Sequence, residues 1–243
     1  MNSLMALVVT AATLGLVHTA LGPDHYLPFV AISRARGWSA GKTAAVTTLC
    51  GIGHVLSSVV LGFVGISFGI ALFRLEAIEA FRGDIAAWLL MVFGFTYFVW
   101  GLWRALRNRR HAHAHTHDDG ETHSHVHAHG GRHAHVHQTE GKKLTPWVLF
   151  LIFVFGPCEP LIPLVMFPAA EGNMLHVAIV AGVFALATVG TMLTIVMAVR
   201  YGLVAATRSE RLTAAFGRIG RFSHAAAGLV VMACGGAITF LGL

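Results

Sequence analysis

The sequence predicts an all-α polytopic membrane protein with six transmembrane spans, arranged as two inverted three-span repeats with broken first helices. Of its 243 residues, 56% are hydrophobic and only 12% are charged, and the charges gather between long apolar runs. At roughly 20 residues per crossing, six runs qualify, and Gly-Pro pairs interrupt the first and the fourth. The expected spans are residues 4–30, 44–73, 85–103, 146–170, 174–199 and 222–243.

The first run carries ionisable side chains inside an apolar segment. His18, Asp24 and His25 lie within eight positions of one another. Because such groups are costly in a bilayer, an ionisable residue within a span indicates a functional site. The run begins within four residues of Met1 without a preceding basic segment, so we expect a retained span and not a cleaved signal.

Gly22-Pro23 separates the two histidines of this run. In an unbroken helix, positions 18 and 25 would be separated by roughly 10 Å of rise, too far for both rings to bind one ion. Pro23 lacks a backbone N–H and disfavours helix at the residue before it, so we expect two half-helices here. In transporters, such breaks bring side chains and free carbonyls together at the membrane midplane.

The second run contributes Gly53-His54. The glycine allows a neighbouring helix to approach closely, and we expect His54 to join the ligands of the first run. The alternative is a lone histidine that is hydrogen-bonded to serine or to backbone.

The fourth run carries Gly156-Pro157-Cys158-Glu159-Pro160 and two further prolines, and cannot form a regular helix. Cys158 is a soft ligand whose thiolate forms readily beside a cation. Glu159 is an intramembrane carboxylate, a candidate ligand whose alternative role is a structural hydrogen bond to freed backbone groups. The residues expected to break helices are Gly22, Pro23, Pro28, Gly156, Pro157, Pro160 and Pro163.

A segment between the third and fourth runs holds eleven of the sixteen histidines. It has little apolar bulk, so we expect it to be disordered without a ligand. Imidazole suits Zn, Cu, Ni and Co, which predicts an auxiliary metal-binding loop; the alternative is a solvated linker. With an ordinary histidine pKa of about 6.5, the loop would be a good ligand array at about pH 7.5 and a poor one below about pH 6. Its histidines are His111, His113, His115, His117, His123, His125, His127, His129, His133, His135 and His137.

The two halves of the chain resemble each other. Gly22-Pro23-Asp24-His25 lines up with Gly156-Pro157-Cys158-Glu159, and Gly94 to Gly101 matches Gly235 to Gly242. Three spans per half make the halves inverted, so the two broken spans would face each other. Their N, O and S donors indicate a transition-metal site and not an alkali-ion site. The expected units are the repeats 1–106 and 145–243 and the His-rich loop 107–144.

Fifteen of the 17 Lys and Arg residues fall in the odd-numbered loops. The other two, Arg74 and Arg82, fall in the loop between the second and third runs, among the acidic residues Glu76, Glu79 and Asp84. The positive-inside rule therefore predicts an inner (plasma) membrane protein with a cytoplasmic His-rich loop and both termini outside. The net charge of +6 follows this pattern, so we expect no nucleic acid partner.

At these motifs the chain resembles the nickel/cobalt permease group and its six-span UreH-like and sulfite-exporter-like relatives of the LysE-type superfamily. The permease signature is His, four residues, then Asp-His, with a Gly-His pair in the next span. Here His18 precedes Asp24-His25 by five intervening residues, and Gly53-His54 matches the second element. The resemblance implies that these residues select and carry Ni²⁺ or Co²⁺, and the His-rich loop resembles that of the efflux branch.

We therefore expect a non-enzymatic permease for a divalent transition metal, Ni²⁺ or Co²⁺ before Zn²⁺ or Cu, with efflux favoured and a homo-oligomer or metallochaperone as further partners. Its expected metal site comprises His18, Asp24, His25, His54, Cys158 and Glu159. One rival is a transmembrane thiol/disulfide carrier, because Gly156-Pro157-Cys158 also resembles a motif of the cytochrome c biogenesis and DsbD-type transporters. The other rival is a sulfite-type exporter of small anions.

Overall fold

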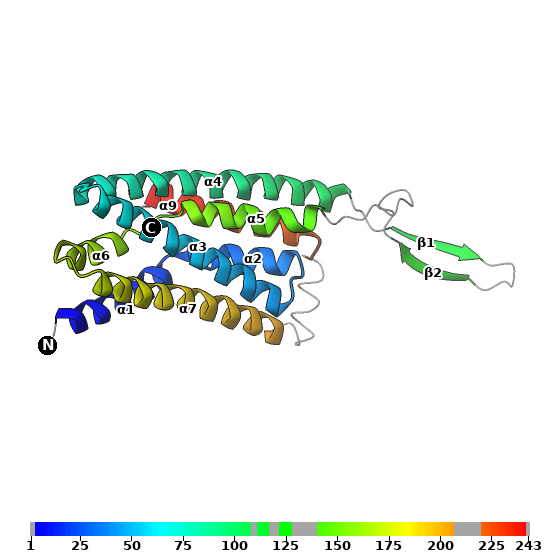
Figure 1. The fold of residues 1–243 in the computed structure, drawn as a ribbon. Coiled ribbons are helices and arrows are strands. Elements are labelled where there is room, and N and C mark those ends of the chain that lie inside the picture. Colours follow the sequence, from blue (N-terminus) through cyan, green and yellow to red (C-terminus); the bar gives the residue numbers. More distant parts are fainter. Residues whose placement is uncertain (1–2, 108–110, 117–121, 128–139, 207–219, 242–243) are drawn as a thin grey trace.

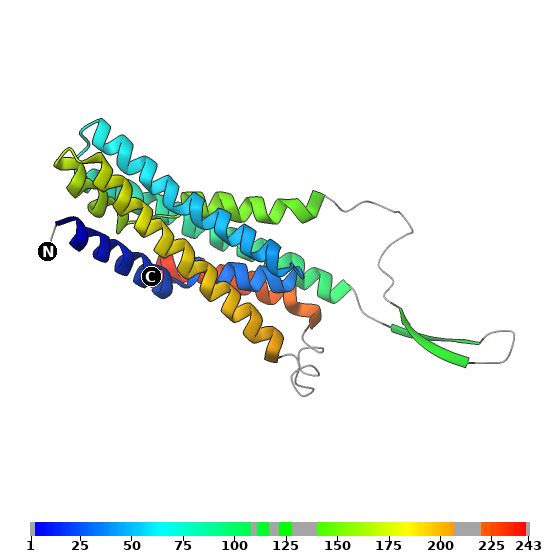
Figure 2. The ribbon, with the colours of Figure 1, turned by 60° about the horizontal axis from the view of Figure 1, so that its bottom comes forward.

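The structure is a computed structural model, which describes residues 3–107, 111–116, 122–127, 140–206 and 220–241. Its helices form one elongated bundle (Figures 1 and 2). Five described helices are long and apolar enough to cross a membrane, and two shorter apolar helices cover Leu144–Phe155 and Leu161–Ala170. These are features of a membrane-embedded protein.

The described residues from 3 to 107 form four α-helices and one short 3₁₀ turn. Helix α1 spans Ser3–Leu21, the turn η1 spans Pro23–His25, and α2 spans Leu27–Ala35. Helix α3 spans Ala40–Ser67 and begins at an N-cap, where Ser39 accepts a hydrogen bond from the Lys42 N–H. Helix α4 spans Leu72–Arg107. It begins well before the run expected from residue 85, so Arg74, Glu79 and Arg82 lie in a helix and not in a loop.

The second half begins with α5, Glu140–Phe155, and α6, Leu161–Ala170, separated by the proline-rich link. Helix α7 spans Met174–Ala206, η2 spans Gly220–Phe222, and α9 spans Ser223–Leu241. Pro28 and Pro163 lie in the first turns of α2 and α6. A missing N–H costs nothing there, so both prolines begin helices instead of breaking them.

Large apolar side chains cover the outside of this bundle, and several polar ones are buried among apolar residues inside it. Leu186 and Phe240 are 77% and 74% exposed, while His25 and His54 are both buried. Glu79 is fully buried. Large exposed apolar side chains together with a buried carboxylate are unusual in a water-soluble protein, and they fit a surface that contacts lipid.

Helices α4 and α9 pack against each other through four glycines. A Cβ on Gly94 would collide with the backbone of Met232, and one on Gly101 with the backbone of Ala225. Gly228 and Gly235 meet the backbone of α4 in the same way. Residue numbers rise along one helix as they fall along the other, so the pair is antiparallel. Of the glycines expected to repeat, Gly242 lies outside the described residues.

The remaining contacts build two apolar clusters. Helix α1 packs on α7, and α3 packs on both α5 and α7. One cluster includes Phe29, Leu149 and Phe153. The other includes Val55 and Phe184. Because Phe153 belongs to one cluster and Val55 follows His54 in the chain, His54 lies where the two clusters meet.

The described part of the His-rich loop forms two antiparallel strands, β1 (His111–Thr116) and β2 (Thr122–His127). Their register pairs His111 with His127, His113 with His125, and His115 with His123. Figures 1 and 2 show this hairpin beyond the end of the bundle. The remaining histidines of the loop, at 117, 129, 133, 135 and 137, lie outside the described residues. Disorder of the loop without a ligand stays a prediction.

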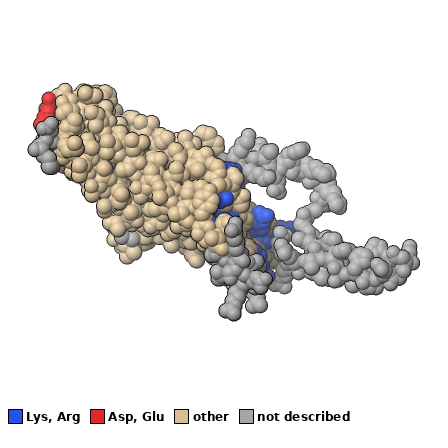
Figure 3. Space-filling model, turned by 90° about the horizontal axis from the view of Figure 1, so that it is seen from below, with Lys and Arg blue, Asp and Glu red and all other residues tan. Residues whose placement is uncertain are grey.

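Charged residues separate along the long axis of the bundle. In Figure 3, the Lys and Arg side chains gather at the end from which the His-rich loop leaves, and acidic side chains lie at the opposite end.

Candidate metal centre

The break after α1 places His18 and His25 side by side. Helix α1 ends at Leu21, and the Gly22 N–H donates the last helical bond to the His18 carbonyl at 3.0 Å. The 3₁₀ turn Pro23–His25 then replaces the α-helix, and His25 packs edge-on against His18 with ring centroids 4.8 Å apart. The two turns of helix that would separate these rings are absent.

Helix α3 supplies the third ring. His54 is T-shaped against His25 at a centroid distance of 5.0 Å, and it is parallel to His18 at 6.5 Å. One ligand nitrogen from each of the three histidines lies within 4.8 Å of the other two. Three residues that are up to 36 positions apart in the sequence thus form one cluster.

The Nε2 atoms of all three histidines are buried and have no hydrogen-bond partner within the described residues. Buried polar atoms in folded proteins are nearly always paired, because an unpaired one loses its bonds to water without replacement. Three such atoms in one cluster therefore indicate a ligand that accepts three nitrogen lone pairs.

The opposite ring nitrogens are held by acceptors. The Nδ1 atom of His25 lies 3.2 Å from both the Gly22 carbonyl oxygen and Asp24 Oδ1. The Nδ1 atom of His54 lies 3.3 Å from the Phe153 carbonyl oxygen. Carbonyl and carboxylate oxygens only accept, so Nδ1 carries the proton in both rings and Nε2 is left with a free lone pair. Metal-binding histidines are oriented by partners of this kind.

The dimensions suit a single small ion. Nitrogen ligands at 2.0–2.1 Å from a tetrahedral metal are about 3.3 Å apart, compared with the 4.8 Å limit here. An inward movement of about 1 to 2 Å would therefore close the site. Beside it, Asp24 and His54 line a cavity of about 30 Å³ together with Gly156 and Pro157. That volume holds one water molecule or one ion and no organic substrate.

The structure places the other expected ligands differently. Asp24 contacts the Nδ1 side of His25 and is not a member of the three-histidine group found among the described residues. Cys158 is buried in the apolar cluster around Val55, and the Glu159 side chain is exposed. Gly156 and Pro157, which precede them, do reach His54 and the small cavity. A ligand role for Cys158 and Glu159 stays a prediction.

Two residues that the sequence analysis assigned to a loop lie close to this centre. Glu79 is fully buried in α4, and the Arg82 Nη1 donates a hydrogen bond to Glu79 Oε1. The spacing of three residues between opposite charges on a helix was the available signal. The surrounding charges lower the hydropathy of the segment, so hydropathy alone assigns it to a loop.

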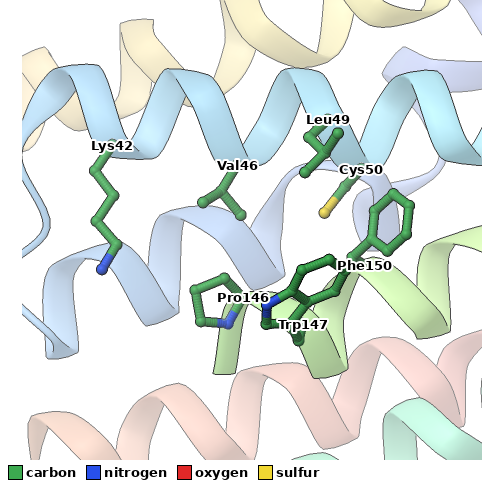
Figure 4. A pocket seen from close by; sticks show the side chains of 7 residues that line it. All are labelled: Lys42, Val46, Leu49, Cys50, Pro146, Trp147 and Phe150. Atoms are coloured by element: carbon green, nitrogen blue, oxygen red, sulfur yellow. The ribbon is translucent and has the colours of Figure 1, made fainter. Parts of the chain in front are cut away.

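Larger cavities occur elsewhere in the described structure. Figure 4 shows one of about 300 Å³ between α3 and α5, with Lys42 at one end and the apolar side chains of Leu49, Trp147 and Phe150 around it. Another of about 310 Å³ lies between α2 and α9. Neither cavity is lined by any of the three clustered histidines, so the size of a cavity does not identify the candidate metal site.

Comparisons of the chain with protein-family models, with curated proteins and with solved structures returned no match. The functional argument therefore depends on the geometry of the histidine cluster.

Proposed function

We propose that this protein is a membrane permease for a divalent transition metal, with His18, His25 and His54 as the ligands of the transported ion. The observation that carries the proposal is that each of these three clustered histidines has a buried Nε2 atom without a hydrogen-bond partner among the described residues. Ni²⁺ and Co²⁺ are the preferred substrates, since imidazole ligands suit late first-row metals and the sequence motifs resemble those of nickel/cobalt permeases. Zn²⁺ and Cu²⁺ are the competing ions.

The ligand set also suits transport. Three neutral imidazoles with the carboxylate of Asp24 behind one of them leave positions open on the metal for water or for the next ligand along a path. A structural site would instead enclose the metal completely. Cys158 and Glu159, at the second helix break, are the proposed ligands of that next position.

Two inverted repeats of three spans are the proposed architecture. In it, α1–α2 corresponds to α5–α6, α3 to α7, and α4 to α9. The contacts of the bundle support this relation, since α1 packs on α7 as α5 packs on α3, and α2 contacts α7 as α6 contacts α3. The pairs α3–α7 and α4–α9 would then lie on the pseudo-two-fold axis. Rocking of one repeat against the other would expose the site to each side in turn.

The proposed orientation puts the basic end of the bundle and the His-rich loop in the cytoplasm, and both termini outside. The loop would then capture cytoplasmic metal and deliver it to the pore, which favours export. A cytoplasmic metallochaperone or a second copy of the chain is the proposed partner.

The thiol/disulfide rival is less well supported. Cys50, Cys158 and Cys234 are all free and buried. Cys50 and Cys158 belong to different apolar clusters. A disulfide relay needs thiols that approach each other and an external partner.

The test is metal flux into proteoliposomes that contain the full-length protein, measured with Ni²⁺, Co²⁺, Zn²⁺ and Cu²⁺. His25→Ala is expected to abolish flux of the transported metal, while Cys158→Ser has a smaller effect. His176→Ala is the matched control, because His176 is half-buried at the start of α7 and outside the cluster. If the wild-type protein moves none of these ions, the permease proposal is wrong.

A further inference from the structure

The ion pair of Glu79 and Arg82 is costly and needs an explanation. Glu79 is fully buried, and the Arg82 side chain is only 15% exposed. Charges inside a membrane protein lose their hydration, and their mutual attraction offsets that cost only when further hydrogen bonds use their remaining polar atoms. The partners of those atoms therefore indicate what the pair does.

One set of partners belongs to the break between α5 and α6. The Arg82 Nη2 donates to the Val154 carbonyl oxygen at 2.9 Å, and Glu79 Oε2 accepts from the Cys158 N–H at 3.1 Å. A broken helix frees carbonyls on one side and N–H groups on the other. In a bilayer no water is present to satisfy them. The Arg82 guanidinium thus pairs with a free carbonyl before the break, and the Glu79 carboxylate pairs with a free N–H after it.

A second set belongs to α3, one turn beyond His54. Ser58 Oγ donates to Glu79 Oε2 at 3.2 Å, and the Arg82 Nη2 donates to Ser57 Oγ at 2.7 Å. Ser57 Oγ in turn donates to the His54 carbonyl oxygen at 2.8 Å. The pair is therefore tied to the backbone of the residue that carries the third imidazole.

Both sets converge on the His54 ring. Phe153, whose carbonyl accepts from His54 Nδ1, directly precedes the Val154 that Arg82 holds. Gly156, two residues before Cys158, lies against the same ring, since a Cβ there would be 2.9 Å from His54 Nδ1. Gly83 in turn lets α4 approach Pro157. No other described carboxylate is fully buried.

We propose that Glu79 and Arg82 are positioning residues: by holding the α5–α6 break and the adjacent turn of α3, they fix the His54 ring with Nδ1 protonated and Nε2 directed at the other two histidines. Neither residue touches the metal. The consequence for metal binding rests on the proposed function, whereas the orientation and the protonated nitrogen of His54 do not.

The first experiment therefore needs no metal. Full-length protein is labelled with [¹⁵N]histidine, and the ring signals of His54 are identified by their absence in His54→Gln. The wild type is expected to show a proton on Nδ1, while Glu79→Gln and Arg82→Lys populate the form with the proton on Nε2. Glu76→Gln and Arg74→Lys are the matched controls, because both residues are exposed on the same helix. If the variants keep the wild-type signals, the positioning role is wrong.

Ser57→Ala removes the hydrogen bonds of Ser57 Oγ to Arg82 and to the His54 carbonyl oxygen, and it leaves the contacts of Glu79 and Arg82 with the α5–α6 break in place. It replaces either variant that fails to fold. It is expected to give the same change to a smaller extent, and unchanged signals in a folded Ser57→Ala protein would equally overturn the proposal.

The second experiment measures binding of Co²⁺ through its visible absorption. Each variant is compared with the same variant carrying His25→Ala, so that the signal of the His-rich loop cancels. Glu79→Gln and Arg82→Lys are expected to weaken the remaining site about tenfold, as substitutions behind metal ligands do. A wild-type Co²⁺ signal equal to that of His25→Ala would refute the metal site, and the histidine spectra would still decide the positioning role.

Discussion

His54 Nδ1 lies 3.3 Å from the carbonyl oxygen of Phe153, 99 residues further along the chain. The acceptor belongs to the last turn of α5, directly before the second helix break. One half of the chain thereby orients a ligand that the other half carries. Changes at the second break should consequently alter the histidine cluster without replacing any histidine.

Gly156→Ala is the smallest such change. The added Cβ would lie 2.9 Å from His54 Nδ1 and 3.1 Å from the Phe153 carbonyl oxygen, so the ring must turn away from its acceptor. We expect metal affinity of the membrane site to fall about tenfold or more. Titration with Co²⁺ measures this, and Gly182→Ala is the control, because a Cβ at Gly182 has open space. Equal affinities in the two variants would contradict the arrangement described.

Asp24→Asn tests whether Asp24 binds the metal itself or only accepts a hydrogen bond from the metal ligand His25. Asparagine still accepts a hydrogen bond from His25 Nδ1 but carries no charge. We expect metal affinity to drop by about ten- to a hundredfold, whereas His25→Ala abolishes binding at the cluster. Glu171→Gln, at the exposed end of α6, serves as control. A loss as complete as that of His25→Ala would make Asp24 itself a ligand.

The three cysteines should resist modification in the folded protein. Cys50 and Cys158 have no exposed surface and Cys234 is 4% exposed. Because thiol chemistry needs access to the sulfur, we expect no labelling by a membrane-permeant maleimide before unfolding and full labelling afterwards. Mass spectrometry reads both states. Rapid labelling of Cys158, or a disulfide in the oxidised protein, would instead favour the redox rival.

Gly228→Leu should strongly destabilise the bundle. The new side chain would meet the backbone nitrogen and Cα of Phe98, and backbone atoms cannot rotate away. Overpacking costs about 1–3 kcal/mol even where side chains can adjust, so we expect a loss at the upper end of that range or above it. Thermal unfolding in detergent measures the effect, with Gly190→Leu as control. Unchanged melting of Gly228→Leu would refute the close packing of α4 and α9.

Deletion of residues 111–137 should lower the amount of metal that the protein binds, and the size of this loss should depend on pH. Above the ordinary histidine pKa of about 6.5, the loop imidazoles are neutral and bind metal; below it, protons occupy the same nitrogens. The difference in bound metal between wild type and deletion is thus expected to be large at about pH 7.5 and small at about pH 5.5. Elemental analysis after dialysis measures it. A difference that does not change with pH would exclude histidine as the ligand.

The sequence was sufficient to predict the helical bundle, the break at Gly22-Pro23 and the grouping of His18, His25 and His54. Apolar runs and isolated ionisable groups are local features, so they can be read residue by residue. The roles of Asp24, Cys158 and Glu159 depend on the directions of their side chains at the irregular helix breaks. The spacing of residues in the sequence does not specify these directions. Glu79 was missed for a related reason: hydropathy counts its charge but not the hydrogen bonds from Ser58 and Cys158 that compensate for it.

The glycine contacts between α4 and α9 also restrict which parts of the molecule can move. Where backbones touch, a shift of one helix along the other drives Cα atoms into carbonyl oxygens, so the two helices resist sliding. The α4–α9 pair is therefore a fixed part of the bundle around which other helices can move. A change of shape around this pair would have to come from other helices. Helix α3, which carries His54, is one of these, because its glycines meet only side chains of neighbouring helices.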